Sequence, residues 1–314
     1  MLAPSTTRQG ILKVLRQAGT APTAPPAGGS LALIGPTWAI DGSGYAFNTP
    51  TLGANLLTNG DMGSATGWTV GSGWAIAAGV ATKTAGAAGN LSQNVITNHR
   101  WYSATYTLVV TASTFGALFG TTANRGIDRT ASGTYTDTKR GDGTAAGGLR
   151  AITTTSAGTA DDMSMREITA NTLFAYTDPG VANAIVAAAV QAWTASTQVG
   201  VFANMDSPAN PQNFLLATLT NANHARLVKC VAGVYSDVVA ETSITTFVAN
   251  AKLEIRRPSG NTYQLWYNNA QVGTDQAVSD AGIISNTYCG IASTYSANKI
   301  SSLEVGGANV PLFF

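Results

Sequence analysis

The sequence predicts an all-β protein: two tandem antiparallel β-sandwiches (jelly rolls), preceded by a short helical or extended N-terminal arm. The first observation is a period of two, as in residues 102–110, where apolar residues alternate with Ser and Thr; this alternation is typical of half-buried strands. The second is the recurrence of turn residues at intervals of about 8–12 residues, as in sandwich proteins. The third is composition: 34 glycines and only 11% charged residues favour strands and turns over exposed helices.

Residues 1–30 are predicted to form the arm. Ile11, Leu12 and Leu15 fall on one face of a helix, and the Pro- and Gly-rich residues 19–30 that follow are typical of a semi-rigid linker. A helix of about three turns is not stable alone in water, so its apolar face is expected to dock. It docks either on this protein or on a partner, and anchoring to a partner is the favoured interpretation.

The N-terminal segment also lacks the features of a secretory signal. Arg8, Lys13 and Arg16 interrupt its apolar residues, whereas a secretory signal needs an unbroken apolar core. No stretch approaches the ~20 apolar residues of a membrane-spanning helix. We therefore expect no membrane association, and release of the protein, if it leaves the cell, by lysis.

The first sandwich is predicted over residues 31–170, with strands at 74–80 and 102–110. The second is predicted over residues 171–314, with a hairpin whose strands are residues 252–256 and 262–267. Residues 181–193 fit a helix by propensity but also alternate like a strand. Because they run directly into the strand-like residues 198–203, we predict a strand. The apolar residues at the C-terminus, 310–314, are expected to pack against the protein.

Two motifs give the first sandwich a family resemblance. Residues 55–69 read NLLTNGDMGSATGWT, residues 73–74 are Gly-Trp, and residues 161–168 read DDMSMREI. This combination resembles jelly rolls of the carbohydrate-binding-module type. The second half resembles concanavalin-A-like or laminin-G-type jelly rolls, through VGVFANMDS at residues 199–207, ARLVKCVAGVY at 225–235, LEIR at 253–256 and LWYNNAQVG at 265–273.

These resemblances imply a role rather than a reaction. Paired modules of this kind occur in bacteriophage virion proteins, so the resemblance implies a non-enzymatic structural protein of a tailed-phage virion: a fibre, tail component or capsid decoration. It would be assembled in the host cytoplasm, bind other virion proteins through the arm, form a homo-oligomer and present its sandwiches to host-surface polysaccharide. The alternatives are a stand-alone glycan-binding module or adhesin, and a polysaccharide depolymerase. The fold itself does not decide among them.

The composition supports the absence of catalysis and of nucleic-acid binding. His99 and His224 are the only histidines, and neither is accompanied by a nucleophile motif. The acidic residues are sparse and spread through turns, whereas glycoside hydrolysis needs a facing pair of carboxylates. The net charge is +1 without a basic stripe, so contacts to phosphates, which supply most nucleic-acid affinity, are not expected.

Two sets of residues remain as candidate sites. In the resembling family a structural calcium ion joins the opening and closing strands; Asn59, Asp61, Asp161 and Asp162 stand at matching positions, and their oxygens suit calcium. Gly63 replaces the usual glutamate of the family, which favours ordinary turn and strand-edge aspartates. Trp266 is opposite in phase to Tyr263, Leu265 and Tyr267, so one of the two faces of this strand is predicted to be exposed and aromatic. A glycan site in the second sandwich is predicted near Trp266, Tyr267 and Asn268, with a core or interface aromatic as the alternative.

The two cysteines, Cys230 and Cys289, form neither a disulfide framework nor a metal motif. Both lie in strand-like segments, and neighbouring strands would be needed to bring them into bonding distance. Two buried free thiols are the favoured interpretation.

Overall fold

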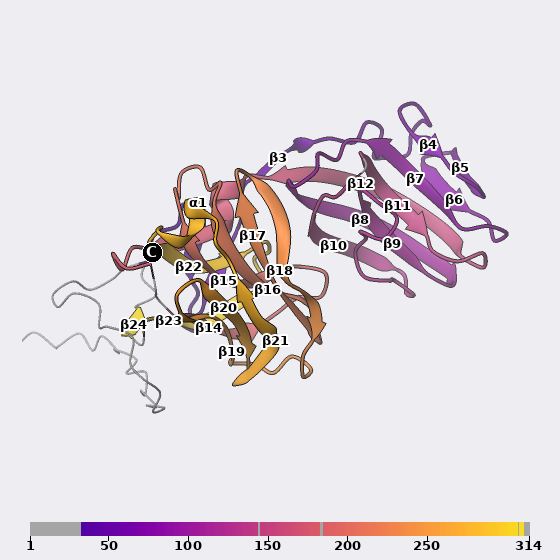
Figure 1. The fold of residues 1–314 in the computed structure, drawn as a ribbon. Helices are drawn as coiled ribbons and strands as arrows, with labels where there is room; N and C mark the ends of the chain where they lie inside the picture. Colours follow the sequence, from indigo (N-terminus) through magenta and orange to yellow (C-terminus); the bar gives the residue numbers. More distant parts are fainter. Residues whose placement is uncertain (1–32, 144, 183–184, 307, 311–314) are drawn as a thin grey trace, which may run out of the picture.

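The computed structural model describes residues 33–143, 145–182, 185–306 and 308–310. Within them the chain is almost entirely β-structure, arranged as two lobes: an indigo-to-magenta lobe and a mainly orange-to-yellow one (Figure 1). Each lobe is a pair of antiparallel sheets. The prediction of two β-sandwiches is therefore confirmed. The predicted N-terminal arm, with Ile11, Leu12 and Leu15, lies outside the described residues, as do residues 311–314.

The first sandwich contains a six-stranded and a four-stranded sheet. The larger sheet has the order β10-β8-β12-β6-β5, with β3 also paired to β12, and the smaller has the order β4-β7-β11-β9. The strands are β3 (Leu52–Asn55), β4 (Thr69–Val70), β5 (Trp74–Ala77), β6 (Val80–Lys83), β7 (Gly89–Asn94), β8 (Trp101–Ala112), β9 (Phe115–Phe119), β10 (Gly133–Arg140), β11 (Ala146–Ala151) and β12 (Ala157–Ile168).

The core of this sandwich confirms the predicted alternation. Tyr102, Ala104, Tyr106 and Leu108 on β8 are all at most 1% exposed, and they pack with the two sandwich tryptophans of the opening motif, Trp68 and Trp74. The residues between them carry hydroxyl groups on the opposite face of the sheet, as the period of two requires. Trp74 and Phe115 meet edge to face, with ring centroids 5.9 Å apart.

The second sandwich is built from an eight-stranded and a six-stranded sheet. The larger has the order β1-β2-β23-β14-β19-β20-β21, with β24 also paired to β23; the smaller has the order β13-β22-β15-β16-β17-β18. The elements are β1 (Trp38–Ile40), β2 (Ala46–Asn48), a 3-10 helix η1 (Ala170–Leu173), β13 (Phe174–Thr177), β14 (Val186–Ala192), β15 (Val199–Met205), β16 (Phe214–Asn221), β17 (His224–Val231), β18 (Val234–Ser243), β19 (Ala251–Ser259), β20 (Thr262–Tyr267), β21 (Ala270–Ala277), α1 (Ala281–Ile284), β22 (Tyr288–Ser293), β23 (Lys299–Val305) and β24 (Ala308–Val310).

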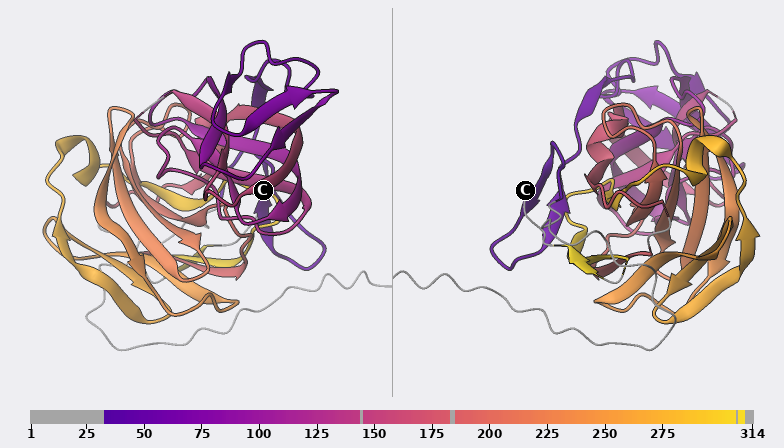
Figure 2. Two further views of the ribbon diagram at one scale, coloured as in Figure 1. Left: turned by 90° about the vertical axis from the view of Figure 1, so that its right-hand side faces the viewer. Right: turned by 60° about the vertical axis from the view of Figure 1, so that its left-hand side comes forward.

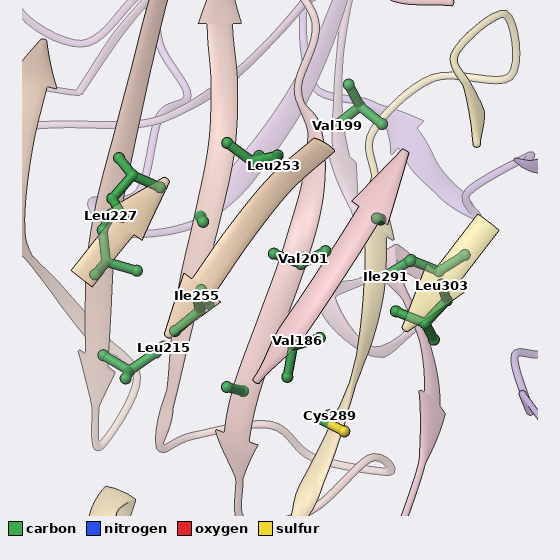
Figure 3. Close-up of a cluster of buried hydrophobic side chains, with 14 of the residues drawn as sticks. Val186, Val199, Val201, Leu215, Leu227, Leu253, Ile255, Cys289, Ile291 and Leu303 are labelled. Carbon is green, nitrogen blue, oxygen red and sulfur yellow. The ribbon is translucent and has the colours of Figure 1, made fainter. Parts of the chain in front are cut away.

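The core between these two sheets is aliphatic. Figure 3 shows side chains of both sheets in it, among them Leu253 and Ile255 of the larger sheet and Val201 and Leu215 of the smaller. The segment that fitted either a helix or a strand is β14, which pairs with β19 and β23. The strand prediction is thus confirmed, because tertiary pairing overrides the helix propensity of its alanines.

The boundary between the sandwiches differs from the predicted one. Strands β1 and β2 lie within residues 31–170, which the sequence assigned to the first sandwich, yet β2 pairs with β23 through Ala46 and Ile300. The side-chain amide of Asn48, which is fully buried, donates to the backbone oxygens of Thr172 (2.9 Å) and Ser293 (2.6 Å). From β1 onward, the described chain therefore contributes first to the second sandwich, then builds the first and returns; Figure 2 shows the indigo segment reaching the second lobe.

A third apolar cluster joins the two sandwiches, and we call it the joint. Trp101 and Ile168 of the first sandwich belong to it. From the second sandwich it takes apolar side chains on the outer face of the smaller sheet together with Leu173 from η1; these are Leu173, Phe174, Phe202, Met205, Phe214, Leu216, Val228, Cys230 and Ala292. Hydrogen bonds accompany it, from Trp101 Nε1 to the Tyr235 hydroxyl (3.1 Å) and between the hydroxyls of Thr138 and Thr294 (2.5 Å).

Both cysteines are free and buried, as predicted. Cys289 belongs to the core between the sheets, whereas Cys230 lies in the joint on the other face of the smaller sheet. Burial raises the pKa of each thiol to about 12. Each therefore remains protonated and unreactive in the folded protein.

Removing the Trp101 side chain is expected to destabilise the protein by about 3–5 kcal/mol, the usual cost of a large buried aromatic residue. The indole is 7% exposed and bonded to Tyr235, so Trp101→Ala leaves a cavity and removes this hydrogen bond. Urea unfolding followed by circular dichroism measures the loss. Val109→Ala on the same strand is the control, because Val109 is 51% exposed and should change stability by only ~0.5 kcal/mol. Equal effects of the two variants would contradict the importance of the joint.

Candidate functional site

Trp266 lies on the outer face of the larger sheet of the second sandwich. Its neighbours along β20, Tyr263, Leu265 and Tyr267, are at most 2% exposed and belong to the core. Since successive side chains of a strand point to opposite faces, Gln264 and Trp266 point away from the core, and both are half-buried. The predicted phase of Trp266, opposite to that of its three neighbours, is the one found.

A network of polar side chains surrounds the indole. The guanidinium of Arg256 on β19 stacks over the ring, 3.9 Å from its centroid, and Trp266 Nε1 donates to Gln264 Oε1 (2.9 Å). On the neighbouring β21, Asp275 Oδ1 accepts from Gln264 Nε2 (2.7 Å) and from Gln271 Nε2 (2.8 Å). We call these five residues the Trp266 face.

The charges around the Trp266 face are paired. Arg256 Nε contacts Glu254 at 2.8 Å, and Lys252 Nζ contacts Glu304 at 2.7 Å. With Asp275, the face and its border carry two cations and three carboxylates. The Trp266 face therefore offers an aromatic plane, amides and a carboxylate without an excess of positive charge.

Tyr267 and Asn268 do not share this face. Tyr267 is 2% exposed, and its hydroxyl accepts a hydrogen bond from the Val248 backbone N–H (2.9 Å). Burial raises the pKa of its phenol. Asn268 is exposed in the turn between β20 and β21, with φ of 48°. Of the three residues predicted for a glycan site, only Trp266 lies on the outer face of the strand.

Sequence reasoning missed the partners of Trp266 although signals for them existed. Gln264 is two residues away on the same strand, so it necessarily shares the face. Arg256 lies on the preceding strand of the predicted hairpin, where Arg256 pairs with Gln264 and Glu254 with Trp266. Asp275 and Gln271 require the position of β21, and a register irregularity between β20 and β21 has no sequence signal.

The two motifs predicted to bind calcium do lie side by side. The backbone N–H of Met163 donates to the Gly60 oxygen (2.8 Å), and a Cβ on Gly60 would meet the Met163 oxygen at 2.0 Å. Glycine is needed here because the closing strand passes so near. Asp162, with φ of 50°, lies in a β-bulge of that strand.

The candidate ligands themselves bond locally. Asn59 Nδ2 donates to the Thr66 oxygen (2.8 Å). Asp61 Oδ1 and Asp161 Oδ1 each accept from a nearby backbone N–H, at 3.2 and 2.7 Å. In the part of the chain that the structure describes, no three His, Cys, Asp or Glu side chains gather in a way that would hold a metal ion. Calcium binding by Asn59, Asp61, Asp161 and Asp162 stays a prediction.

The most buried carboxylate is structural. Asp137 is fully buried; it accepts from the Tyr106 hydroxyl at 2.6 Å and forms an ion pair with Arg129, whose guanidinium also stacks on Tyr135 (4.4 Å). A Cβ on Gly126 would meet Asp137 Oδ2 at 2.1 Å. Asp137 thus holds the segment before β10 in place through its contact with Arg129. Burial, together with the nearby carboxylate of Asp137, raises the pKa of the Tyr106 hydroxyl.

Neither histidine has a catalytic neighbourhood. His224 Nδ1 lies 2.8 Å from the side-chain oxygens of Asn221 and Asn223, and its Nε2 lies 3.3 Å from Ser243 Oγ. His99 contacts the joint. A cavity beside the joint is lined by apolar and hydroxyl-bearing residues and Gln198, with no acidic residue in its lining. It has room for about one water molecule, so it does not accommodate a saccharide.

No protein-family model matches this sequence, and no curated protein matches it. Among solved structures, the chain is similar to the carbohydrate-binding module CBM66 from Bacillus subtilis. That similarity has a TM-score of 0.27 and 11% sequence identity and covers 76% of this chain and 95% of that chain. At so low a TM-score it carries no argument about this chain. Within the described residues, no helix is long and apolar enough to cross a membrane.

Calcium is expected to leave the melting temperature unchanged, because the side chains of Asn59, Asp61 and Asp161 already have local partners. A site that was filled at a hundred times its dissociation constant would add about 2.7 kcal/mol. The melting temperature is compared in excess EDTA and in millimolar calcium by thermal unfolding, and magnesium is the control ion. A rise specific to calcium, lost in Asp61→Ala, would establish the family's metal site instead.

Proposed function

We propose that this protein is a non-catalytic carbohydrate-binding protein and that the Trp266 face holds a saccharide. The observation that carries the proposal is a half-buried tryptophan on an outer sheet face, surrounded by two glutamines, an arginine and an aspartate within one hydrogen-bond network. Ligand sites combine an apolar surface with a few placed polar groups that fix orientation. The Trp266 face has this composition.

The chemistry of the face suits a sugar ring. Arg256 lies over the Trp266 ring, held by the attraction between a cation and an aromatic ring, and the C–H groups of a pyranose can pack against the exposed part of this stacked pair. Gln264, Gln271 and Asp275 supply amide donors and carboxylate acceptors at the edge of this surface. Vicinal hydroxyls of a sugar both donate and accept hydrogen bonds, so both kinds of group have partners.

The charge pattern favours a neutral saccharide. Around Trp266 the cations Lys252 and Arg256 are each paired with a glutamate, and Asp275 adds a third carboxylate. Among the described residues of this face and its border, a uronate or other acidic sugar would meet no cation without a carboxylate partner. We therefore infer a neutral host-surface or cell-wall glycan as the ligand class, with binding that changes little with salt.

Trp266→Ala is expected to weaken binding about tenfold or more, because an aromatic contact of ~1.4 kcal/mol corresponds to a factor of ten in the dissociation constant. A glycan array probed with the full chain finds the ligand, and calorimetry measures the variants. Tyr267→Phe is the matched control: its ring is buried, so binding should be retained. Unchanged binding by Trp266→Ala would show that the site lies elsewhere on the protein. If the chain bound none of the neutral glycans on the array, the proposal would be contradicted.

The low content of charge supports a second candidate, a structural role in a phage virion. Only 11% of the residues are charged, and such a surface is weakly protected against association. Contact with virion proteins or with further copies of this chain would cover such a surface, and residues 1–30 would serve as the anchor. The two candidates are compatible, since a virion protein can also bind host glycans.

Deleting residues 1–20 is expected to abolish incorporation into particles while both sandwiches stay folded, because Ile11, Leu12 and Leu15 lie in the deleted segment. Burial of each of these side chains is worth about 1.5–3 kcal/mol. Antibody-gold labelling of density-purified particles measures incorporation, and circular dichroism checks the fold. Normal incorporation of the truncated chain would reject the anchor.

A further inference from the structure

His99 is a contact between the two sandwiches. It lies in the loop between β7 and β8, with φ of 64°, and its own backbone N–H donates to the Gly141 oxygen (3.1 Å). Its Nδ1 accepts a hydrogen bond from the backbone N–H of Tyr235 in the second sandwich (3.3 Å). The imidazole also stacks on the Tyr235 ring, with centroids 6.4 Å apart and planes inclined by 19°.

Tyr235 gathers the remaining contacts of this part of the joint. The Arg140 guanidinium, at the end of β10, stacks 4.5 Å from its ring centroid. Trp101 donates to its hydroxyl and meets its ring edge to face, at 6.2 Å. Phe214 packs on the ring from the second sandwich, at 5.7 Å. Tyr235 is thus held by three residues of the first sandwich: His99, Trp101 and Arg140.

The hydrogen bond to Tyr235 requires an unprotonated Nδ1. A protonated imidazole donates from both nitrogens. The Nδ1–H of His99 and the backbone N–H of Tyr235 would then be two donors facing each other, and the hydrogen bond between them would be lost. The new charge would also lie beside Arg140, which faces the imidazole from β10. Arg100, next in sequence, is paired with Glu167, and the ion pair of Arg226 with Asp237 in the second sandwich interacts electrostatically with Arg140. Among the described residues, no carboxylate bonds to His99.

We propose that His99 is an acid-sensitive latch: its protonation releases the loop before β8 from Tyr235 and loosens the joint between the two sandwiches. Only two histidines are present in 314 residues, and this one holds an inter-sandwich hydrogen bond as an acceptor. A histidine so placed converts a fall in pH into a loss of contact.

The direction of the pH dependence follows from linkage. Burial, and then the positive Arg140, lower the pKa of His99 below its ordinary 6.5. The open state, with an ordinary pKa, therefore binds the proton more readily than the closed state. The contact is fully present above pH 6.5 and is lost progressively as the pH falls from 6.5 through the lowered pKa.

The two cysteines provide the measurement. Cys230 lies in the joint beside Tyr235 and is 1% exposed, whereas Cys289 lies in the core of the second sandwich and is 2% exposed. Labelling with 4,4′-dithiodipyridine, which reacts with thiols in mild acid, and peptide mass spectrometry follow each thiol of the full chain separately. Between pH 7.5 and 5 we expect the Cys230 rate to rise several-fold relative to Cys289, by at most about tenfold per pH unit.

Two variants make the test specific. His99→Asn removes the imidazole but tolerates the positive φ, and should abolish the pH dependence of Cys230 labelling. His224→Asn, at the only other histidine, should retain it. A rate of Cys230 that does not change with pH, a rise that persists in His99→Asn, or a rise of Cys289 in step with Cys230, which reports global unfolding, would each overturn the latch.

Discussion

The sheet formed by β13, β22 and β15 to β18 is apolar on both of its faces. Along β15, Val199 and Val201 point into the core of the second sandwich, while Phe202 points to the other side. The same holds for β16, where Leu215 and Phe214 lie on opposite faces. A sheet of this kind cannot expose either face, because buried apolar area contributes about 25 cal/mol per Å². The first sandwich covers the outer face with Trp101 and Ile168, so the arrangement of the two sandwiches follows from the composition of one sheet.

This constraint also explains the path of the chain. Trp101 begins β8 and Ile168 ends β12. These two long strands are neighbours in the sheet, and Trp101 is paired with Ile168. The end of the first sandwich that faces the second is therefore the end at which the chain leaves it, and η1 leads directly into β13. Asn48 binds the Thr172 oxygen on the way in. Entry and exit thus meet at the joint, which places the loop carrying His99 against Tyr235.

Local pattern predicted the strands well and their partners poorly. Alternation identifies the core of β8, and the same rule placed Trp266 outside the core. The rule also assigns Trp266 and Tyr267 to opposite faces, since consecutive residues of a strand alternate, and the structure places only Trp266 on the outer face. By contrast, no local signal links Ala46 to Ile300. A continuous apolar run such as β15 also does not reveal that one of its faces packs in the core of the second sandwich and the other in the joint. Those features depend on long-range packing.

The joint also bears on which surface is free to bind. A β-sandwich has two outer faces, and in the second sandwich the first covers that of the smaller sheet. Along β19 and β20 the outer face of the larger sheet carries Glu254, Arg256, Gln264 and Trp266 in place of an apolar surface. A tryptophan there has no packing role comparable to that of Trp101, because its neighbours are polar and its indole N–H bonds to Gln264. The proposed saccharide, which is itself both apolar and hydrogen-bonding, would suit an aromatic side chain placed within such a polar network.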